Sequence, residues 1–215
     1  PVAAEPPPRL LCVGDSITAG NGDTDDAPFG YRDHLQRFLL PRQVVLVGPQ
    51  TAQGPPPPGL TDGFFAPHAG TFQAILEGLP AVLTRWMPVP NPPGSAVLLQ
   101  AGLHDVRSCF PCRDEDLKGL ARSARSVCEQ VVSYDPTLAC IVSTVIPPVG
   151  ERSHYSVRRF NAWLRVVGVR IADTQHAFDR WQKRGVSLVA DCVNPTDQGY
   201  GIIAIPFAEA LEQPQ

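Results

Sequence analysis

The run Leu10-Leu11-Cys12-Val13-Gly14-Asp15-Ser16-Ile17-Thr18 decides the fold of this 215-residue chain. Its apolar half is typical of a strand buried in a parallel sheet, and that half ends abruptly at Gly14. Because glycine permits a sharp turn, Ser16 can present its hydroxyl and its amide at the carboxyl end of the strand, where clefts form in such sheets. A short Gly-Asp-Ser stretch often does no more than cap a turn. The rest of the chain therefore decides whether Ser16 is a nucleophile.

Apolar runs alternate with helical patterns from this strand to the end of the chain. Tyr31, Leu35, Phe38 and Leu39 share one helix face, and proline clusters fall between the periodic segments, as is typical of loops. Such alternation predicts right-handed crossovers, hence a five-stranded parallel sheet in a three-layer α/β/α sandwich. Further strands are predicted over residues 44–47, 96–100, 138–145 and 169–172, and helices over residues 31–40, 71–87, 114–134, 155–166 and 196–211.

Length and composition limit the classes of protein that the chain can belong to. We expect residues 1–215 to form one domain, with residues 1–8 as a proline-rich N-terminal extension. The net charge is only −3 and the basic residues are scattered, which argues against a nucleic-acid partner. No apolar run approaches the ~20 residues of a membrane span. We expect no membrane partner and a monomer; no leader pattern is visible, and a secreted and a cytoplasmic location both stay open.

The six cysteines fall into two groups. Cys12, Cys128 and Cys140 lie in apolar or helical patterns and are predicted to be small buried core residues. Cys109 and Cys112 lie in a polar loop, where their spacing suits a local disulfide, half of a zinc site, or free thiols. A second cysteine pair with zinc spacing is missing from the sequence. We therefore expect no metal and no cofactor.

Short motifs recur in a fixed order along almost the whole chain. They are Gly14-Asp15-Ser16-Ile17-Thr18, Gly30-Tyr31-Arg32, Val45-Leu46-Val47-Gly48, Asp62-Gly63, His68-Ala69-Gly70, Gly102-Leu103-His104-Asp105, Asp191-Cys192-Val193-Asn194-Pro195 and Gly199-Tyr200. In the order and spacing of these motifs the chain resembles the SGNH (GDSL-type) hydrolases, and within them the acetylxylan-esterase-like carbohydrate esterase family three. The resemblance implies a flavodoxin-like fold with strand order 2-1-3-4-5 and an oxyanion hole that includes Ser16 and Gly70. It also implies an ester or acyl substrate on a sugar or small metabolite.

Two departures from the family pattern fall on the chemistry itself. The third block of the family reads Gly-x-Asn-Asp, and His104 stands here at the Asn position. The last block reads Asp-x-x-His-Pro, and Asn194 stands at the His position. Asparagine cannot accept a proton from serine at neutral pH, so the triad implied for Ser16 and Asp191 lacks its general base. Asp191 then either keeps a catalytic role or only holds the Asn194 amide and caps the closing helix.

Three functions are compatible with these exchanges. In the first, His104 serves as the base for Ser16 in an altered serine ester hydrolase, and its imidazolium supplies the oxyanion-hole donor that asparagine supplies in the family. In the second, His104 and Asp191 act as acid and base in a cyclisation, elimination or isomerisation. In the third, the pocket binds an acylated carbohydrate or small molecule without turnover.

Other residues near the blocks are assigned by their position in the pattern. Phe64, Phe65 and His68 precede Gly70 in a loop that should border the cleft, so they are candidates for substrate contact. Thr18 and Asp105 are expected to support the loops through hydrogen bonds. The remaining histidines are expected to have surface or structural roles: His34, His154 and His176.

Overall fold

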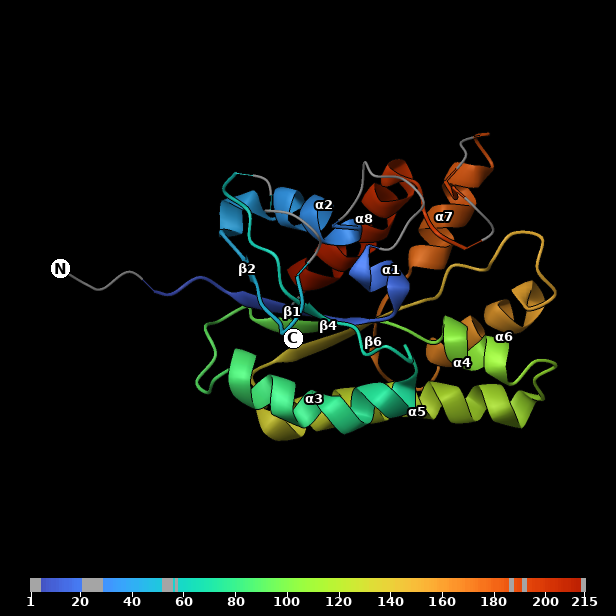
Figure 1. Cartoon of the computed structure of the whole chain (residues 1–215), viewed down its shortest axis with the longest axis horizontal. Coiled ribbons are helices and arrows are strands. Elements are labelled where there is room, and N and C mark those ends of the chain that lie inside the picture. Colours follow the sequence, from blue (N-terminus) through green and yellow to red (C-terminus); the bar gives the residue numbers. More distant parts are fainter. Residues whose placement is uncertain are drawn as a thin grey trace.

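A computed structural model describes residues 5–20, 29–51, 56, 58–185, 188–190 and 193–213 of the chain. Strands and helices alternate along it, as the apolar pattern predicts (Figure 1). In chain order the elements are β1 (Arg9–Gly14), α1 (Ser16–Ala19), α2 (Tyr31–Phe38), the 3₁₀ helix η1 (Leu40–Arg42), β2 (Val45–Leu46), β3 (Phe64–Phe65), α3 (Phe72–Trp86), β4 (Ala96–Gln100), α4 (Leu103–Ser108), α5 (Asp114–Tyr134), β5 (Ala139–Ser143), α6 (His154–Leu164), β6 (Arg170–Ala172), α7 (Thr174–Gln182) and α8 (Asp197–Glu212).

The sheet is parallel, with the strand order β2-β1-β4-β5-β6. Numbered without the two-residue β3, this is the order 2-1-3-4-5, so the predicted topology is confirmed. β3 also pairs with β1 and lies off the main path. β1 and β4 are in register from Leu10 opposite Ala96 to Gly14 opposite Gln100, so the two strands end side by side.

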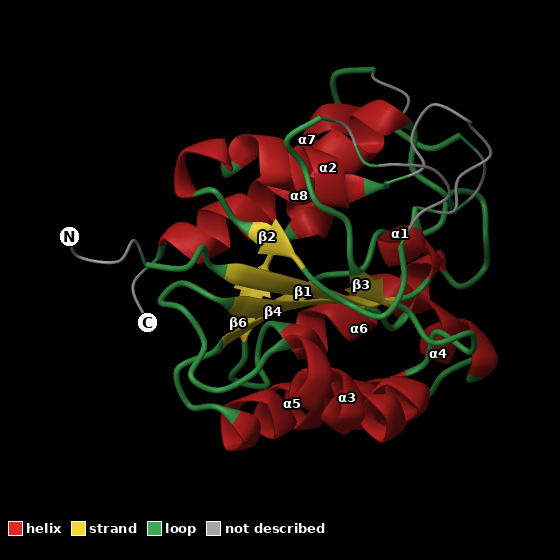
Figure 2. Ribbon diagram, turned by 60° about the vertical axis from the view of Figure 1, so that its left-hand side comes forward, coloured by secondary structure: helices red, strands yellow, loops and turns green. Residues whose placement is uncertain are grey.

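Two helical layers cover the sheet, which gives the predicted three-layer α/β/α sandwich (Figures 1 and 2). Helices α3, α4, α5 and α6 pack on one face with Leu11 and Val13 of β1. Helices α1, α2, α7 and α8 pack on the other face with Leu10 and Cys12. Side chains of β1 alternate between the two cores, as a strand buried on both faces requires. In the part of the chain that the structure describes, no helix is long and apolar enough to span a bilayer.

The longer elements lie within a few residues of their predicted bounds. Thr71 and Thr196 cap α3 and α8 by accepting from the amides of Ala74 and Gly199, so each helix begins one residue later than predicted. The prediction for Phe38 is wrong: its side chain is half exposed, although the pattern placed it on the buried face of α2. Neither α7 nor β3 was predicted; β3 has too few residues to show a strand period.

The cysteines require a second correction. Cys128 of α5 and Cys140 of β5, expected as free core residues, form a disulfide across a sequence separation of 12. A half-cystine in an apolar pattern resembles a buried thiol, because either is a small buried hydrophobe. Cys109 and Cys112 also form a disulfide, one of the alternatives that the sequence left open. Cys12 is buried and free, as predicted.

The disulfide between α5 and β5 should contribute measurably to stability. Replacing both Cys128 and Cys140 by alanine is expected to lower the free energy of unfolding by about 3 kcal/mol, because the bridge closes a loop that the unfolded chain would otherwise explore. Urea unfolding of the variant against the parent measures this loss. The matched control replaces Cys109 and Cys112 by alanine; their loop is much shorter, and a loss as large as that of the first variant would contradict the loop-length argument.

Candidate active site

A tight contact between two strand ends shapes the turn that carries Ser16. A Cβ atom on Gly14 would lie 1.9 Å from the carbonyl oxygen of Gln100 and 2.3 Å from Thr18 Oγ1, so only glycine fits at this position. The same Gln100 carbonyl accepts from the Asp15 amide at 3.3 Å and from Thr18 Oγ1 at 3.4 Å. The end of β4 therefore holds the turn after β1, and Thr18 takes part as a support.

Asp15 starts the short helix α1, in which Ser16 is the first residue. Asp15 Oδ1 accepts from the Ile17 amide at 3.0 Å, whereas its Oδ2 is buried and has no hydrogen-bond partner among the described residues. The pKa of Asp15 is raised to about 7, mainly because the carboxyl group is buried; the backbone donors oppose this rise, and nearby Asp105 adds to it. Ser16 itself is partly exposed. A buried carboxyl group that is readily protonated thus precedes an accessible serine.

Arg32 supports α1 from beneath. Its side chain is fully buried; Nη1 donates to the Thr18 carbonyl, and Nε pairs with Asp62 Oδ1 at 2.9 Å. The guanidinium carbon lies 4.1 Å from the centre of the Phe64 ring. This contact corrects the prediction that Phe64 contacts substrate, because the ring is buried against a cation inside the fold. The motif at Tyr31-Arg32 was the sequence signal for this buried arginine.

Gly70 and His104 face each other across the turn. With φ at +60°, Gly70 is so close to its neighbours that a Cβ atom would lie 3.0 Å from His104 Cδ2, 3.1 Å from Asp15 Cβ and 3.5 Å from His104 Nε2. The structure therefore brings Gly70, His104 and the residue before Ser16 together. The Gly70 amide, expected to donate to an oxyanion, donates instead to the Pro67 carbonyl at 2.8 Å and closes a turn over residues 67–70. The expected role of Gly70 is therefore corrected, because its amide already donates to Pro67 and is not free to bind an oxyanion.

Helix α4 holds the imidazole of His104 in a partly buried position. Removal from water lowers the pKa of His104 below its ordinary value of 6.5, and the charge of Arg107 lowers it further, so the ring is neutral at neutral pH. The neighbouring carboxylate of Asp105 accepts from the Phe72 amide at 3.2 and 3.3 Å. Asp105 is thus a support, as expected, and ties α4 to the start of α3.

The other predicted site residues lie on separate segments. Asn194 is partly buried three residues before α8, and its carbonyl accepts from the Ala190 amide at 2.9 Å. Asp191 lies outside the described residues. His68 is exposed in the turn that ends at Gly70. Phe65 is partly buried, and its ring packs against Gly78 of α3, where a Cβ atom would lie 2.5 Å from Phe65 Cζ.

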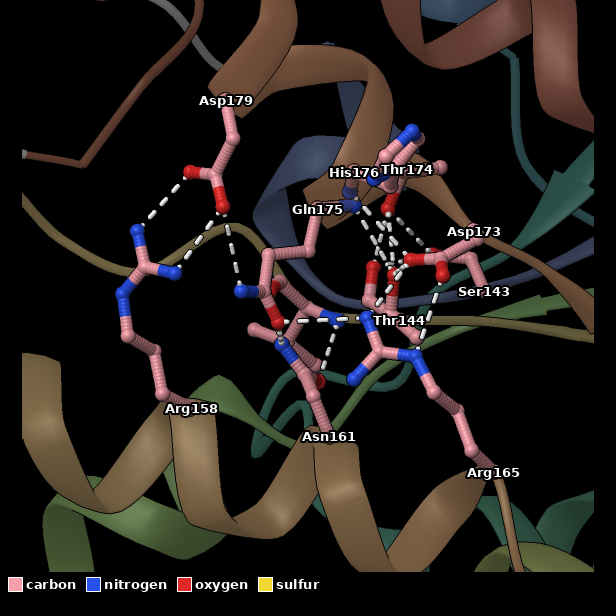
Figure 3. Close-up of polar contacts among 11 residues, drawn as sticks. Ser143, Thr144, Arg158, Asn161, Arg165, Asp173, Thr174, Gln175, His176 and Asp179 are labelled. Carbon is pink, nitrogen blue, oxygen red and sulfur yellow. Dashed lines mark hydrogen bonds and ion pairs between the residues drawn. The ribbon is translucent and has the colours of Figure 1, made fainter.

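Polar side chains fill the space at the carboxyl ends of β5 and β6 (Figure 3). Ser143 Oγ donates to the buried side chain of Gln100, and Thr144 Oγ1 donates to Asp173 Oδ1 at 3.0 Å. The Asn161 side chain accepts from the Val145 amide at 2.8 Å and donates to the Val145 carbonyl at 2.6 Å. These hydroxyl and amide groups thus have partners within the protein, on neighbouring side chains or on the backbone.

The remaining histidines have protein partners or lie on the surface. His34 Nε2 lies 2.9 Å from Asp197 Oδ1 and so joins α2 to α8. His154 Nδ1 lies 3.0 Å from the Pro148 carbonyl oxygen, and His176 is exposed on α7. Within the described ranges, no three His, Cys, Asp or Glu residues are grouped as metal ligands would be.

Known proteins resemble this chain in structure and not in sequence. No protein-family model matches the sequence, and no curated protein matches it. Solved structures do match over nearly the whole chain. A family 3 carbohydrate esterase from Clostridium thermocellum is 20% identical, with a TM-score of 0.69 over 95% of this chain and 94% of that one.

Two further structures agree with the first. A carbohydrate esterase family 3 structure from Talaromyces cellulolyticus is 17% identical, with a TM-score of 0.68 over 95% of this chain and 96% of that one. A putative GDSL-like lipase from Parabacteroides merdae is 15% identical, with a TM-score of 0.69 over 96% of both chains. The chain therefore has the fold of the SGNH (GDSL-type) hydrolases, as its motifs predict.

Enlarging Gly70 should disturb His104 directly. Gly70→Ala is expected to lower the free energy of unfolding by more than the ~1–2 kcal/mol that a positive φ costs, because its methyl group would press on the imidazole and on Asp15. Gly168→Ala is the matched control, since Gly168 also has a positive φ and nothing within 4 Å of its Cβ position. Urea unfolding and the NMR signals of the His104 ring measure the two effects. Unchanged His104 signals in Gly70→Ala would refute the contact.

Proposed function

We propose that the protein is an altered serine ester hydrolase that acts on an ester or acyl group of a sugar or small metabolite. In this proposal Ser16 is the nucleophile and His104 is its general base. The observation that carries it is that the His104 imidazole and the Asp15 side chain both lie against Gly70, which brings a base near the residue that precedes the serine. The fold shared with carbohydrate esterases supports the choice of an ester substrate.

The electrostatics of His104 favour a base over a fixed cation. Its lowered pKa keeps the ring neutral at neutral pH, so a ring nitrogen is free of charge and can accept a proton. As Ser16 Oγ attacks the ester carbonyl, its proton passes to His104, and the imidazolium then returns that proton to the leaving alcohol. Water hydrolyses the acyl-serine by the same transfers in reverse. Water is the only co-reactant.

The oxyanion would receive fewer hydrogen bonds than in the family pattern, where an asparagine stands at the position of His104. The Ser16 amide and the imidazolium formed during attack are the proposed donors, while the Gly70 amide is engaged with Pro67. The loss of one such donor costs roughly 3 kcal/mol of transition-state stabilisation. We therefore expect slow turnover. The engaged Gly70 amide also favours the second candidate function, which is binding of the same acylated ligand without turnover.

Hydrolysis of a short activated ester should depend on both proposed residues. Ser16→Ala and His104→Asn are each expected to reduce the rate by at least about 10³-fold, because each removes a member of a unit that acts together. The parent rate should rise with pH through a midpoint below 6.5, as the neutral form of His104 becomes populated. His34→Asn serves as the control, since His34 pairs with Asp197 away from the turn.

The same variants separate hydrolysis from binding. A His104→Asn protein that hydrolyses the ester as fast as the parent would refute the proposed base. If the parent binds an acetylated sugar without hydrolysing it, and His104→Asn binds it equally well, the binding function replaces the hydrolase, since asparagine can still donate from its amide.

Restoring the residue of the family pattern should increase turnover. Asn194→His is expected to raise the rate at least about tenfold, because an imidazole at this position would supply the base that the resemblance places beside Ser16. The double variant Asn194→His/His104→Asn restores both family residues and should be faster still. Steady-state rates across about pH 6 to 9 test this. No gain by either variant, with circular dichroism like that of the parent, would mean that the pocket has diverged beyond these two positions.

A further inference from the structure

A pocket of about 320 Å³ lies between α7 and α8, beside the edge strand β6. Strands β4 and β5 separate β6 from β1, so this pocket is distinct from the candidate site at Ser16. Figure 2 shows the two helices next to each other on the same face of the sheet. A pocket of this volume holds a molecule the size of one sugar or one aromatic ring. None of its lining residues belongs to the proposed catalytic group.

The floor of the pocket is apolar and continuous with the core. Ala177 and Trp181 of α7 line one side, and Ile205 and Pro206 of α8 line the other. Ala177, Trp181 and Ile205 are partly buried and pack against the core cluster on this face. The floor is thus fixed by the fold, and a ring placed on it would gain hydrophobic contact.

Two exposed arginines line the pocket. Arg180 belongs to α7, and Arg184 lies two residues beyond the end of that helix. Within the described residues neither forms an ion pair. Arg184 stacks on Trp181, with its guanidinium carbon 5.0 Å from the ring centre, which holds that charge beside the floor. Asp173 also lines the pocket, but its carboxylate is paired with Arg165 at 2.8 Å. Two like charges that line the same pocket repel each other, and a bound carboxylate would relieve the repulsion.

The opposite wall adds an acceptor. Glu209 of α8 lines the pocket, is exposed, and has no ion pair with any described residue. A carboxylate in this position repels an anion but accepts from hydroxyl groups. An anion clamp, an apolar floor and a hydroxyl acceptor together select a ring that bears one carboxylate and several hydroxyls.

We propose that the pocket between α7 and α8 binds a sugar acid of the uronate type, with its carboxylate on Arg180 and Arg184 and a hydroxyl on Glu209. A uronate and an aromatic acid share one chemical feature, which is a carboxylate on a ring with an apolar face. Glu209 distinguishes the two, because an aromatic acid without hydroxyls has nothing to donate to it. The proposal does not depend on hydrolysis at Ser16.

Calorimetric titration of the full chain with sodium D-glucuronate tests the proposal, with D-glucose and benzoate as comparison ligands. We expect glucuronate to bind, glucose to bind at least about tenfold more weakly, and Arg180→Gln/Arg184→Gln to weaken glucuronate at least about tenfold. The control Arg122→Gln/Lys183→Gln removes two charges outside the pocket, one on α5 and one at the end of α7, and should leave binding unchanged. Ester hydrolysis should be the same in both double variants.

The same titration with Glu209→Gln tests the role of the hydroxyl acceptor. This substitution should weaken glucuronate severalfold and leave benzoate unaffected or slightly tighter, because it removes a hydroxyl acceptor and a negative charge. Absence of glucuronate binding, or equal loss in the control variant, would overturn the proposal. Tighter binding of benzoate than of glucuronate, with Glu209→Gln having no effect on the latter, would overturn the sugar-acid assignment in favour of an aromatic acid.

Discussion

The contact between Gly14 and the last carbonyl of β4 is the constraint on which the site depends. No side chain fits between β1 and β4 at this point, so the backbone of the Ser16 turn lies directly on the end of the neighbouring strand. The segments that follow the two strands therefore begin beside each other. One contains Asp15 and Ser16, and the other leads into the helix with His104. Their proximity follows from strand register and does not require long side chains to reach across a gap.

Buried polar groups add a second layer of order beneath that contact. Arg32 joins α1 to Asp62 and to the Phe64 ring, and Asp105 joins α4 to α3. Removing either partner of the buried Arg32–Asp62 pair leaves an unpaired charge, which is costly, so that link resists rearrangement. Asp15 is different, because one of its carboxyl oxygens is buried with no hydrogen-bond partner among the described residues, and its pKa rises accordingly. The rigid part of the turn thus contains one group whose ionisation is unfavourable.

Periodicity predicted the longer elements because each buries a regular set of apolar side chains. The strand at Ala96–Gln100 and the helix at Asp114–Tyr134 have the predicted bounds. Periodicity does not reveal bonds between side chains, because a cysteine in a disulfide and a buried free cysteine occupy the same positions in an apolar pattern. Cys128 and Cys140 look like core residues in sequence, and their disulfide depends on a helix lying against a strand. Phe64 looked like a loop aromatic because a strand of two residues has no detectable period. The proximity of His104 to Gly70 followed from the resemblance, but the engagement of the Gly70 amide with Pro67 depends on a local turn.

The hydrogen bonds at the ends of β5 and β6 have a consequence for how this fold can change. Hydroxyl and amide groups at the ends of β5 and β6 bond to one another, with Asn161 and Asp173 completing the set (Figure 3). A substitution there removes a partner from several neighbours at once. Asn161 joins α6 to the segment after β5 and to Gln175 of α7, and Asp173 joins that segment to the first turn of α7. A single exchange at either residue is therefore felt in more than one element, which ties these helices to the strand ends as one unit.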